Sequence, residues 1–395
     1  MKVPKGMSAL PAGYDCLRLL KSLYGLKQAG RYWYELLSRT LLALGMLVMA
    51  TCDPCLFTHF SSGGRRFTML LAHVDDLLIV STEEDFVRHL EEGVRKEFDI
   101  QNSGEPSLLL GMHIERDILT GFIKLHQRRY INDVIVRFNM SSCKVVSSPT
   151  DPSIVLSADL ESDLLEDDVP YREAVGSLMY AAVTTRPDIS FAVNRVARYV
   201  SAPRRSHWIA VKRVIAYLSG TRDHGLIFKP TGSIGLSLSA YCDADYAMDI
   251  DTRRSTTGYI IFVNNTPISW KCCLQSSVAL STCVAELYAI CEVSKQVVWI
   301  RNLLEEIGYK QEEATTVFND NQAALAVCAN PVLHKHAKCV GVSIAFIREL
   351  IAEAVMRTEY VASSYNLADF LTKAFSGTSF KAALSLVTGF SSFAN

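Results

Sequence analysis

Two adjacent acids, Asp75 and Asp76, lie between short apolar runs, where acidic side chains are an unusual choice. Asp is a poor strand former, and neighbouring like charges repel each other. A divalent cation would remove that conflict, because Mg²⁺ sites for phosphoryl transfer combine one or two carboxylates with substrate phosphates. The simpler alternative is a polar turn that binds nothing, and the pair alone favours that alternative.

Four further acids occupy positions where strands and helices are expected to begin or end. Asp243 ends an alternating polar and apolar run, and Asp320 follows a short apolar strand. Glu286 lies in a long helical pattern, and Asp369 opens another. Such acids can converge on one sheet edge, where two Mg²⁺ ions would activate water and stabilise the departing oxygen of a phosphodiester. Crowding would couple their affinities for protons and metal. The competing interpretation is coincidence among 41 acidic residues.

The eleven cysteines give little support for a thiolate metal site. Cys52 and Cys55 form one Cys-x-x-Cys pair, and no second pair follows at zinc spacing. A second candidate set is Cys328, His334, His336 and Cys339. Scattered cysteines in an intracellular protein mostly act as small buried hydrophobic residues. We therefore predict that thiolates bind no metal in this chain.

The first half of the chain predicts the elements that would position the paired acids. Two apolar strands within Phe67–Val80 predict a hairpin with Asp75 and Asp76 at its bend. Periodic apolar residues also predict a helix over residues 32–42, an amphipathic helix over 84–98, and short strands near 108–114 and 121–125. Residues 141–170 are rich in Ser, Asp, Glu and Pro, which indicates a linker.

The second half predicts the elements that would gather the other four acids. Residues 171–220 are expected to be helical, with a break at Arg186-Pro187-Asp188 that tethers the helix ends. A β-meander over 235–263, a long helix over 278–307, a strand at 315–319, a helix, a strand at 355–361 and a final helix are expected to follow. This order predicts a mixed sheet with helices on its faces, which is an α/β fold.

Composition bounds the class of protein. The 395 residues are 49% hydrophobic and 21% charged, which fits two or three globular domains. No apolar run reaches membrane-spanning length and no signal-peptide pattern is present, so we expect an intracellular protein of the cytoplasm or nucleus. The formal net charge of −1 gives nucleic-acid binding no support. Arginine pairs such as Arg253–Arg254 are most simply explained as solvated surface.

Segments on both sides of the predicted hairpin carry a resemblance to a known family. They are Lys21–Gly30, Trp33-Tyr34, His73–Asp76, Leu110–Met112 and Gln127–Tyr130. In this order they resemble the reverse transcriptase of copia-type LTR retrotransposons. The resemblance implies that Asp75 and Asp76 are two of three metal-binding acids of a polymerase palm. It also implies that the nucleotide pocket is lined by Gly25, Leu26, Lys27 and Gln28.

The resemblance also implies a limit on polymerase activity. His73 departs from the family's Tyr-Val-Asp-Asp pattern. In the family the third carboxylate and the fingers come before the region that this chain matches, and Asp15 is not equivalent to that carboxylate. Because two metals about the α-phosphate need all three acids, we expect this chain alone not to polymerise DNA.

Segments near the C-terminus resemble the ribonuclease H of the same family. They are Tyr241–Asp245, Thr252–Tyr259, Ile268–Trp270, Ala279–Ser281, Asp320–Gln322 and Leu367–Lys373. The resemblance implies a ribonuclease H-like fold with a metal-binding set of Asp243, Glu286, Asp320 and Asp369, and Asp245 is an alternative to Asp243. The implied reaction is Mg²⁺- or Mn²⁺-dependent cleavage of RNA in an RNA–DNA hybrid, recognised by helix shape and 2′-OH groups.

Two departures favour a rival interpretation. Val284 stands where the family usually has Glu, and Cys339-Val340-Gly341 replaces His-Ile-Asp, with no later His before Phe346. A His near the metals assists proton transfer or product release, so its loss would slow turnover. The rival is a catalytically inactive transposon remnant that at most binds nucleic acid.

Taken together, these segments predict four regions. Residues 1–140 are expected to form a truncated reverse transcriptase palm with a thumb-like region, and 141–170 a linker. Residues 171–230 are expected to form a helical connection, and 231–395 the ribonuclease H-like domain. The expected partner is an RNA–DNA hybrid or another nucleic acid, with no membrane. The sequence indicates no oligomeric state.

Overall fold

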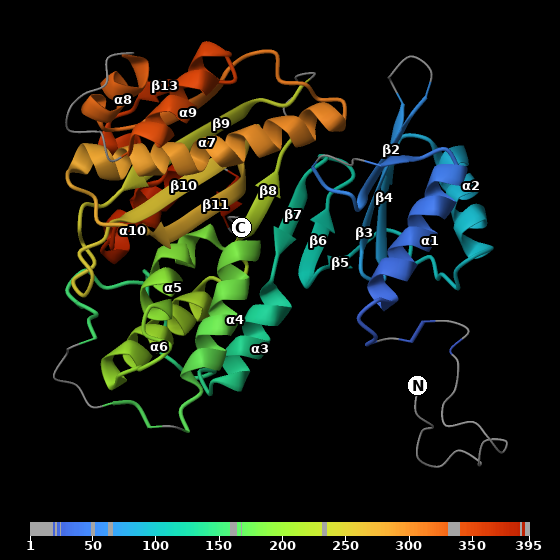
Figure 1. The fold of residues 1–395 in the computed structure, drawn as a ribbon. Helices are drawn as coiled ribbons and strands as arrows, with labels where there is room; N and C mark the ends of the chain where they lie inside the picture. Colours follow the sequence, from blue (N-terminus) through green and yellow to red (C-terminus); the bar gives the residue numbers. More distant parts are fainter. Residues whose placement is uncertain are drawn as a thin grey trace, which may run out of the picture. The chain divides into compact units, whose positions relative to one another are not determined.

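The computed structural model describes residues 19, 22–23, 25–48, 52–61, 66–158, 164–166, 168–230, 235–330, 340–387 and 389–391. Asp15, Lys21, His334, His336 and Cys339, which the sequence singled out, lie outside these residues. The chain forms two compact units, Met1–Gly104 and Glu105–Asn395. Figure 1 shows their helices and strands coloured along the sequence.

The first unit packs two helices against an antiparallel four-stranded sheet in the order β1-β2-β3-β4. Its elements are α1 (Ala29–Ala43), β1 (Leu47–Val48), β2 (Leu56–Phe60), β3 (Phe67–His73), β4 (Asp76–Ser81) and α2 (Glu84–Arg95). Apolar residues at helical spacing, Leu37 and Leu41 on α1 and Leu90 on α2, meet Phe57 and Leu70 from alternating strand positions. One small core results, and the predicted helices over 32–42 and 84–98 are confirmed.

The predicted hairpin around the paired acids is also confirmed. β3 and β4 pair in antiparallel register as far as His73 and Asp76, so Val74 and Asp75 form the bend between them. Val74 has a φ of 52°, in the left-handed region that tight hairpin bends use. The bend therefore presents both acidic side chains at the tip of the hairpin, where they are exposed.

A mixed five-stranded sheet forms the centre of the second unit, in the order β11-β10-β9-β12-β13. Its strands are β9 (Leu238–Ala244), β10 (Thr256–Val263), β11 (Thr266–Leu274), β12 (Thr315–Asn319) and β13 (Met356–Tyr360). β10 is antiparallel to β9 and β11, whereas β12 is parallel to β9 and β13. The C-terminal ends of β9 and β12 therefore lie at the same edge of the sheet.

Helices cover both faces of this sheet, which explains why almost every residue of β10 is buried. Tyr259 and Ile261 share a core with α7 (Thr282–Glu306), α8 (Gln322–Ala329) and α9 (Gly341–Ala352). Ile260 and Phe262 alternate with them and pack into the helical core of the other face. Figure 1 shows α7 lying across the sheet. The predicted α/β fold class is confirmed.

Helices α3 to α6 pack on the other face, together with a buried ion pair. The helices are α3 (Arg128–Arg137), α4 (Tyr171–Thr184), α5 (Ser190–Ala197) and α6 (Arg205–Gly220). At the predicted break between α4 and α5, Arg186 is fully buried and donates to Asp188 through Nε (2.9 Å) and Nη2 (2.7 Å). Its Nη1 donates to the carbonyl of Thr221 (2.9 Å), and the hydroxyl of Tyr217 donates to Asp188 (2.7 Å). The pair ties the break to the end of α6.

A second sheet of this unit joins segments far apart in the sequence, in the order β14-β8-β7-β6-β5. Its strands are β5 (Leu108–Leu109), β6 (Met112–Arg116), β7 (Ile123–His126), β8 (Gly225–Phe228) and β14 (Phe390–Ser391). The sequence predicted the β5–β7 region but neither β8 nor β14. Ser148, Thr150 and Leu156, within the predicted linker, are buried. The domain boundaries at residues 140, 170 and 230 stay predictions.

We expect Arg186→Met to destabilise the second unit by about 3–5 kcal/mol, because the substitution leaves Asp188 as a buried charge without its partner. Urea denaturation followed by circular dichroism measures this change. The control is Arg172→Met on the exposed face of α4, which should change the free energy of unfolding by less than about 0.5 kcal/mol. Equal effects of the two substitutions would contradict a special role for the buried pair.

Candidate metal centre

Asp243 is presented by β9, the middle strand of the central sheet, and its residue is only 1% exposed. Oδ2 accepts a hydrogen bond from the hydroxyl of Thr372, and Nζ of Lys373 lies 3.4 Å from the same oxygen. Burial raises the pKa of Asp243, while the charge of Lys373 acts in the opposite direction. The buried carboxylate is thus held by Thr372 and Lys373, which belong to the C-terminal segment (residues 372–373) that follows η4 (Asp369–Leu371).

Glu286 reaches the same region from α7. Ser281 caps this helix by accepting a hydrogen bond from the backbone N–H of Val284 (3.2 Å), which fixes the first turn. Glu286 Oε2 accepts a hydrogen bond from Nδ2 of Asn319 (2.8 Å), the last residue of β12. Burial and the nearby charge of Asp243 raise the pKa of Glu286 from 4.5 to about 9.

Asp320 follows β12 at the edge where β9 also ends, and its Oδ2 accepts a hydrogen bond from the hydroxyl of Ser363 (2.5 Å). One carboxylate oxygen from each of Asp243, Glu286 and Asp320 lies within 4.8 Å of the other two. The parallel pairing of β9 with β12 and the crossing of α7 bring these three acids together, although 77 positions separate the first from the last.

This donor set fits a divalent cation of the Mg²⁺ class. All three ligands are hard carboxylate oxygens, which Mg²⁺ and Mn²⁺ prefer over nitrogen and sulfur. The raised pKa of Glu286 reflects the cost of burying this carboxylate and of placing it near the charge of Asp243. A bound divalent cation would lower that cost, so proton binding and metal binding would compete at this cluster.

Asp369, the fourth predicted acid, opens the 3-10 turn η4 (Asp369–Leu371) and is joined to the cluster through Lys373. Nζ of Lys373 lies 3.0 Å from Oδ1 of Asp369 and 3.4 Å from Oδ2 of Asp243. Burial and the charge of Asp243 raise the pKa of Asp369 to about 7. Among the described residues, Asp369 is not part of the group of three that share the 4.8 Å limit.

Gly258 allows the C-terminal segment to approach Asp243. It pairs with Asp243 across β9 and β10. A Cβ at this position would lie 2.7 Å from Cγ2 of Thr372, 2.8 Å from Cβ of Leu371 and 3.3 Å from the carbonyl of Ala368. Only a residue without a side chain lets these atoms pack this closely. The position of Thr372 and Lys373 beside Asp243 therefore depends on Gly258.

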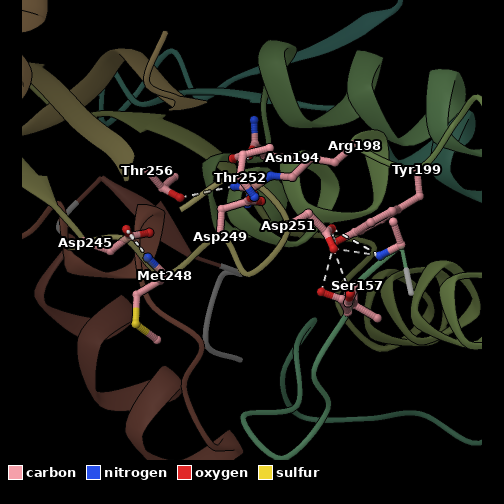
Figure 2. Close-up of polar contacts among 12 residues, drawn as sticks. Ser157, Asn194, Arg198, Tyr199, Asp245, Met248, Asp249, Asp251, Thr252 and Thr256 are labelled. Atoms are coloured by element: carbon pink, nitrogen blue, oxygen red, sulfur yellow. Dashed lines mark hydrogen bonds and ion pairs between the residues drawn. The ribbon is translucent and has the colours of Figure 1, made fainter. Parts of the chain in front are cut away.

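The other predicted residues lie elsewhere in their units. Asp245, the alternative to Asp243, accepts a hydrogen bond from the backbone N–H of Met248 (3.3 Å) in the loop after β9, as Figure 2 shows. Asp75 and Asp76 lie at the exposed bend of their hairpin, and no described acid, His or Cys completes a metal group with them. Gly25–Gln28 form a turn before α1, with Gly25 at φ +89°.

Sequence reasoning missed the residues that hold the acids in place. Asn319 is fully buried and donates from Nδ2 to both Glu286 and the carbonyl of Cys242 (3.1 Å). Asn366 donates to the same carbonyl (3.0 Å). Lys373 follows Asp369 by four residues, a spacing that suggests an ion pair on a helical turn. Nothing in the local pattern singles out Asn319 from its neighbour Asn321.

Comparisons with known proteins identify the family. Residues 1–152 match the reverse transcriptase (RNA-dependent DNA polymerase) family. The chain is 37% identical over 393 residues to the retrovirus-related Pol polyprotein from transposon TNT 1-94 of Nicotiana tabacum. It is 30% identical over 252 residues to a transposon Ty5-1 protein of Saccharomyces cerevisiae, across 64% of this chain and 80% of that protein. The chain belongs to the copia-type retrotransposon Pol family.

This Pol chain spans only part of its larger relatives. The match to the tobacco polyprotein covers 98% of this Pol chain but 29% of the relative. Among solved structures, LC11 ribonuclease H1 isolated from compost aligns over 38% of this Pol chain and 98% of its own, with 14% identity and a TM-score of 0.28. None of the helices described for this Pol chain is long and apolar enough to cross a bilayer.

We expect the stability of the metal-free Pol chain to fall as pH rises from about 7 to 8.5. The pKa of Glu286 is about 9 in the folded protein and 4.5 at its ordinary value, so the folded state keeps a proton that the unfolded state has lost. The free energy of unfolding then falls by up to ~1.4 kcal/mol per pH unit. Urea denaturation in EDTA measures the slope, and Mg²⁺ should reduce it.

The control for this experiment is Glu286→Gln, which cannot ionise and should flatten the slope. Three histidines with a lowered pKa make the free energy of unfolding rise with pH, but only below about pH 6.5. They are His126, His207 and His224. An equal slope in the wild type and in Glu286→Gln would show that Glu286 is not protonated in the metal-free fold.

We expect Gly258→Ala to weaken both the fold and its response to metal. The added Cβ must displace the segment that carries Thr372 and Lys373, at a cost of about 1–3 kcal/mol. Thermal unfolding with and without Mg²⁺ measures both effects. The control is Gly176→Ala on α4, where a Cβ meets nothing within 4 Å and should stabilise the helix slightly. A neutral Gly258→Ala would rule out the proposed tight packing.

Proposed function

We propose that this chain carries a ribonuclease H that cleaves the RNA strand of an RNA–DNA hybrid with Mg²⁺ or Mn²⁺. The observation that supports this most directly is the convergence of Asp243, Glu286 and Asp320 within 4.8 Å. Family membership supports it as well, because the tobacco relative is a retrovirus-related Pol polyprotein from a transposon. The proposed metal-binding set is Asp243, Glu286 and Asp320, and Asp369 acts beside it through Lys373.

The chemistry would divide between the metal and the chain's own side chains. When bound, the divalent metal would supply an activated water and stabilise the departing oxygen of the phosphodiester. Asp243 and Asp320, at the ends of two parallel strands, would bind the metal from the sheet, and Glu286 would bind it from α7. Asn319 would keep Glu286 oriented by donating to its Oε2 (2.8 Å). The rigid sheet and helix would fix the distances between the carboxylates.

Lys373 has a positioning role in this proposal. Its ammonium group lies between Asp243 and Asp369, and these two charges raise its pKa despite the opposing effect of burial. Lys373 therefore stays charged and partly neutralises the cluster. The Lys373 ammonium group, beside Asp243 and Asp369, would reduce the net negative charge that the scissile phosphate meets on entering the site.

For the first unit we propose a more limited role. Asp75 and Asp76 sit at a hairpin bend in a region that matches the reverse transcriptase family. We propose that they are two of the family's palm acids and that Gly25–Gln28 belong to its nucleotide pocket. A polymerase would need a third carboxylate beside them to hold two metals about the α-phosphate.

We expect the purified full chain to cleave a labelled RNA–DNA hybrid in Mg²⁺ and to leave a matching DNA duplex intact. Asp320→Asn should lower the cleavage rate by at least about a hundredfold, because the substitution removes one negative ligand from the metal group. Denaturing gel electrophoresis of the labelled RNA strand measures the rate. Asp117→Asn, an exposed acid in the β6–β7 turn, is the matched control and should cleave like the wild type.

Two results would reject the proposed function. A folded full chain that binds Mg²⁺ but leaves the hybrid intact would favour the inactive remnant, in which the acids persist without turnover. Cleavage that persists in Asp320→Asn would indicate a contaminating nuclease. Circular dichroism of each variant shows whether a loss of cleavage reflects unfolding.

A further inference from the structure

The loop between β9 and β10, residues Asp245–Ser255, leaves the sheet directly beyond Asp243. β9 and β12 are parallel, so this loop emerges at the same edge as Asp320. Its ends are joined by two hydrogen bonds, from Asp245 N–H to the backbone carbonyl of Thr256 (3.1 Å) and from Ala247 N–H to the side-chain Oγ of Ser255 (3.0 Å). These hydrogen bonds hold the two ends of the loop together next to the metal centre.

Both carboxylate oxygens of Asp249 accept hydrogen bonds, and one of these bonds joins the loop to the helical core. Its Oδ2 accepts from Nη1 of Arg198 (2.7 Å), a residue at the end of α5. Its Oδ1 accepts from the backbone N–H (2.8 Å) and the hydroxyl (2.6 Å) of Thr252. Figure 2 shows Arg198 reaching Asp249 and Thr256 at the foot of the loop. Asp249 is 5% exposed, so this ion pair is shielded from water.

Asp251 forms a second anchor, on the segment before α4. Its carboxylate accepts from the hydroxyl of Ser157 (2.7 Å), the backbone N–H of Ala158 (3.0 Å) and the hydroxyl of Tyr199 (3.0 Å). Figure 2 shows Ser157 and Tyr199 beside Asp251. The third acid of the loop, Asp245, binds the backbone N–H of Met248. All three carboxylates therefore find partners other than the two arginines of their own loop.

Arg253 and Arg254 are consequently left without a counter-ion. Within the part of the chain that the structure describes, neither side chain forms an ion pair or a hydrogen bond. Arg253 is exposed and has a φ of +55°, a left-handed conformation that costs energy in a residue with a side chain. Backbone hydrogen bonds hold this conformation, from Arg253 N–H to the carbonyl of Asp249 (2.8 Å) and from Asp249 N–H to the carbonyl of Arg254 (3.2 Å).

We propose that Arg253 and Arg254 bind the phosphodiester backbone of the nucleic acid that enters the metal centre. This inference rests on the proposed function and names the part of the substrate that the loop contacts. Both guanidinium groups stand on an anchored loop at the edge that carries Asp243 and Asp320. Two cations at this place offset the repulsion between the acidic cluster and a polyanion, which a chain of net charge −1 must overcome locally.

Guanidinium groups suit this ligand for chemical reasons. Each presents a planar set of N–H donors that matches two phosphate oxygens and stays charged at every physiological pH. Because the loop is already held by Asp249 and Asp251, ordering it on binding costs little conformational entropy. Phosphate contacts carry no base information, so the contact would position any hybrid sequence over the acids.

The test compares hybrid binding by the full chain with Arg253→Gln/Arg254→Gln. A fluorescently labelled RNA–DNA hybrid is titrated in Ca²⁺, which takes the same oxygen ligands as Mg²⁺. We expect the double variant to bind roughly tenfold more weakly, with a plot of log K against log salt shallower by about 1 to 2. Arg172→Gln, which removes the charge of one exposed arginine on α4, is the control and should bind like the wild type.

Further variants separate the possible outcomes. Arg253→Lys/Arg254→Lys keeps the charge and should retain the salt dependence, and all variants should unfold at the wild-type temperature, since the arginines have no described partners to lose. Unchanged affinity in the double Gln variant, or an equal loss in Arg172→Gln, overturns the phosphate contact while leaving the ribonuclease proposal intact. A wild-type chain that neither binds nor cleaves the hybrid overturns both.

Discussion

The burial of negative charge is the constraint on which the second unit depends. Asp243 and Glu286 meet where helices on both sides of the sheet leave little water, and burial raises the pKa of each. Donors meet this cost from separate elements: Asn319 from β12, and Thr372 and Lys373 from the C-terminal segment. The acidic cluster forms only when the sheet, α7 and the C-terminal segment are all folded together. Formation of the site therefore depends on the folding of the whole unit.

Buried charges are also paired at two places outside the metal centre. Arg186 and Asp188 are buried as a pair at a helix break, and Arg198 and Asp249 are shielded as a pair where the β9–β10 loop meets α5. Such pairs add little net stability compared with apolar packing, but breaking either one leaves a charge that the interior cannot solvate. They therefore act mainly to specify one arrangement, in which the helices on one face hold the loop that borders the metal centre.

Elements with strong local patterns could be predicted from the sequence, and contacts between distant elements could not. Strand alternation located β12 and the hairpin around Asp75, because the pattern of side chains alone determines them. β8 and β14 are too short to show a period and exist through pairing. For the site, the four acids were found by resemblance. The separation of Asp369 from the group of three, and the part played by Asn319, depend on side-chain geometry that only the packed sheet defines.

The sheet β14-β8-β7-β6-β5 joins strands from distant parts of the second unit by hydrogen bonds. Its strands come from the beginning, the middle and the very end of this unit, with β7 paired to β8 and β8 paired to β14. A protease that cuts the backbone between α3 and α4 would not release two independent halves, because the β7–β8 ladder and the shared helical core still join them. The two fragments would stay associated without a covalent bond between them. A single cut in the backbone therefore does not divide this unit.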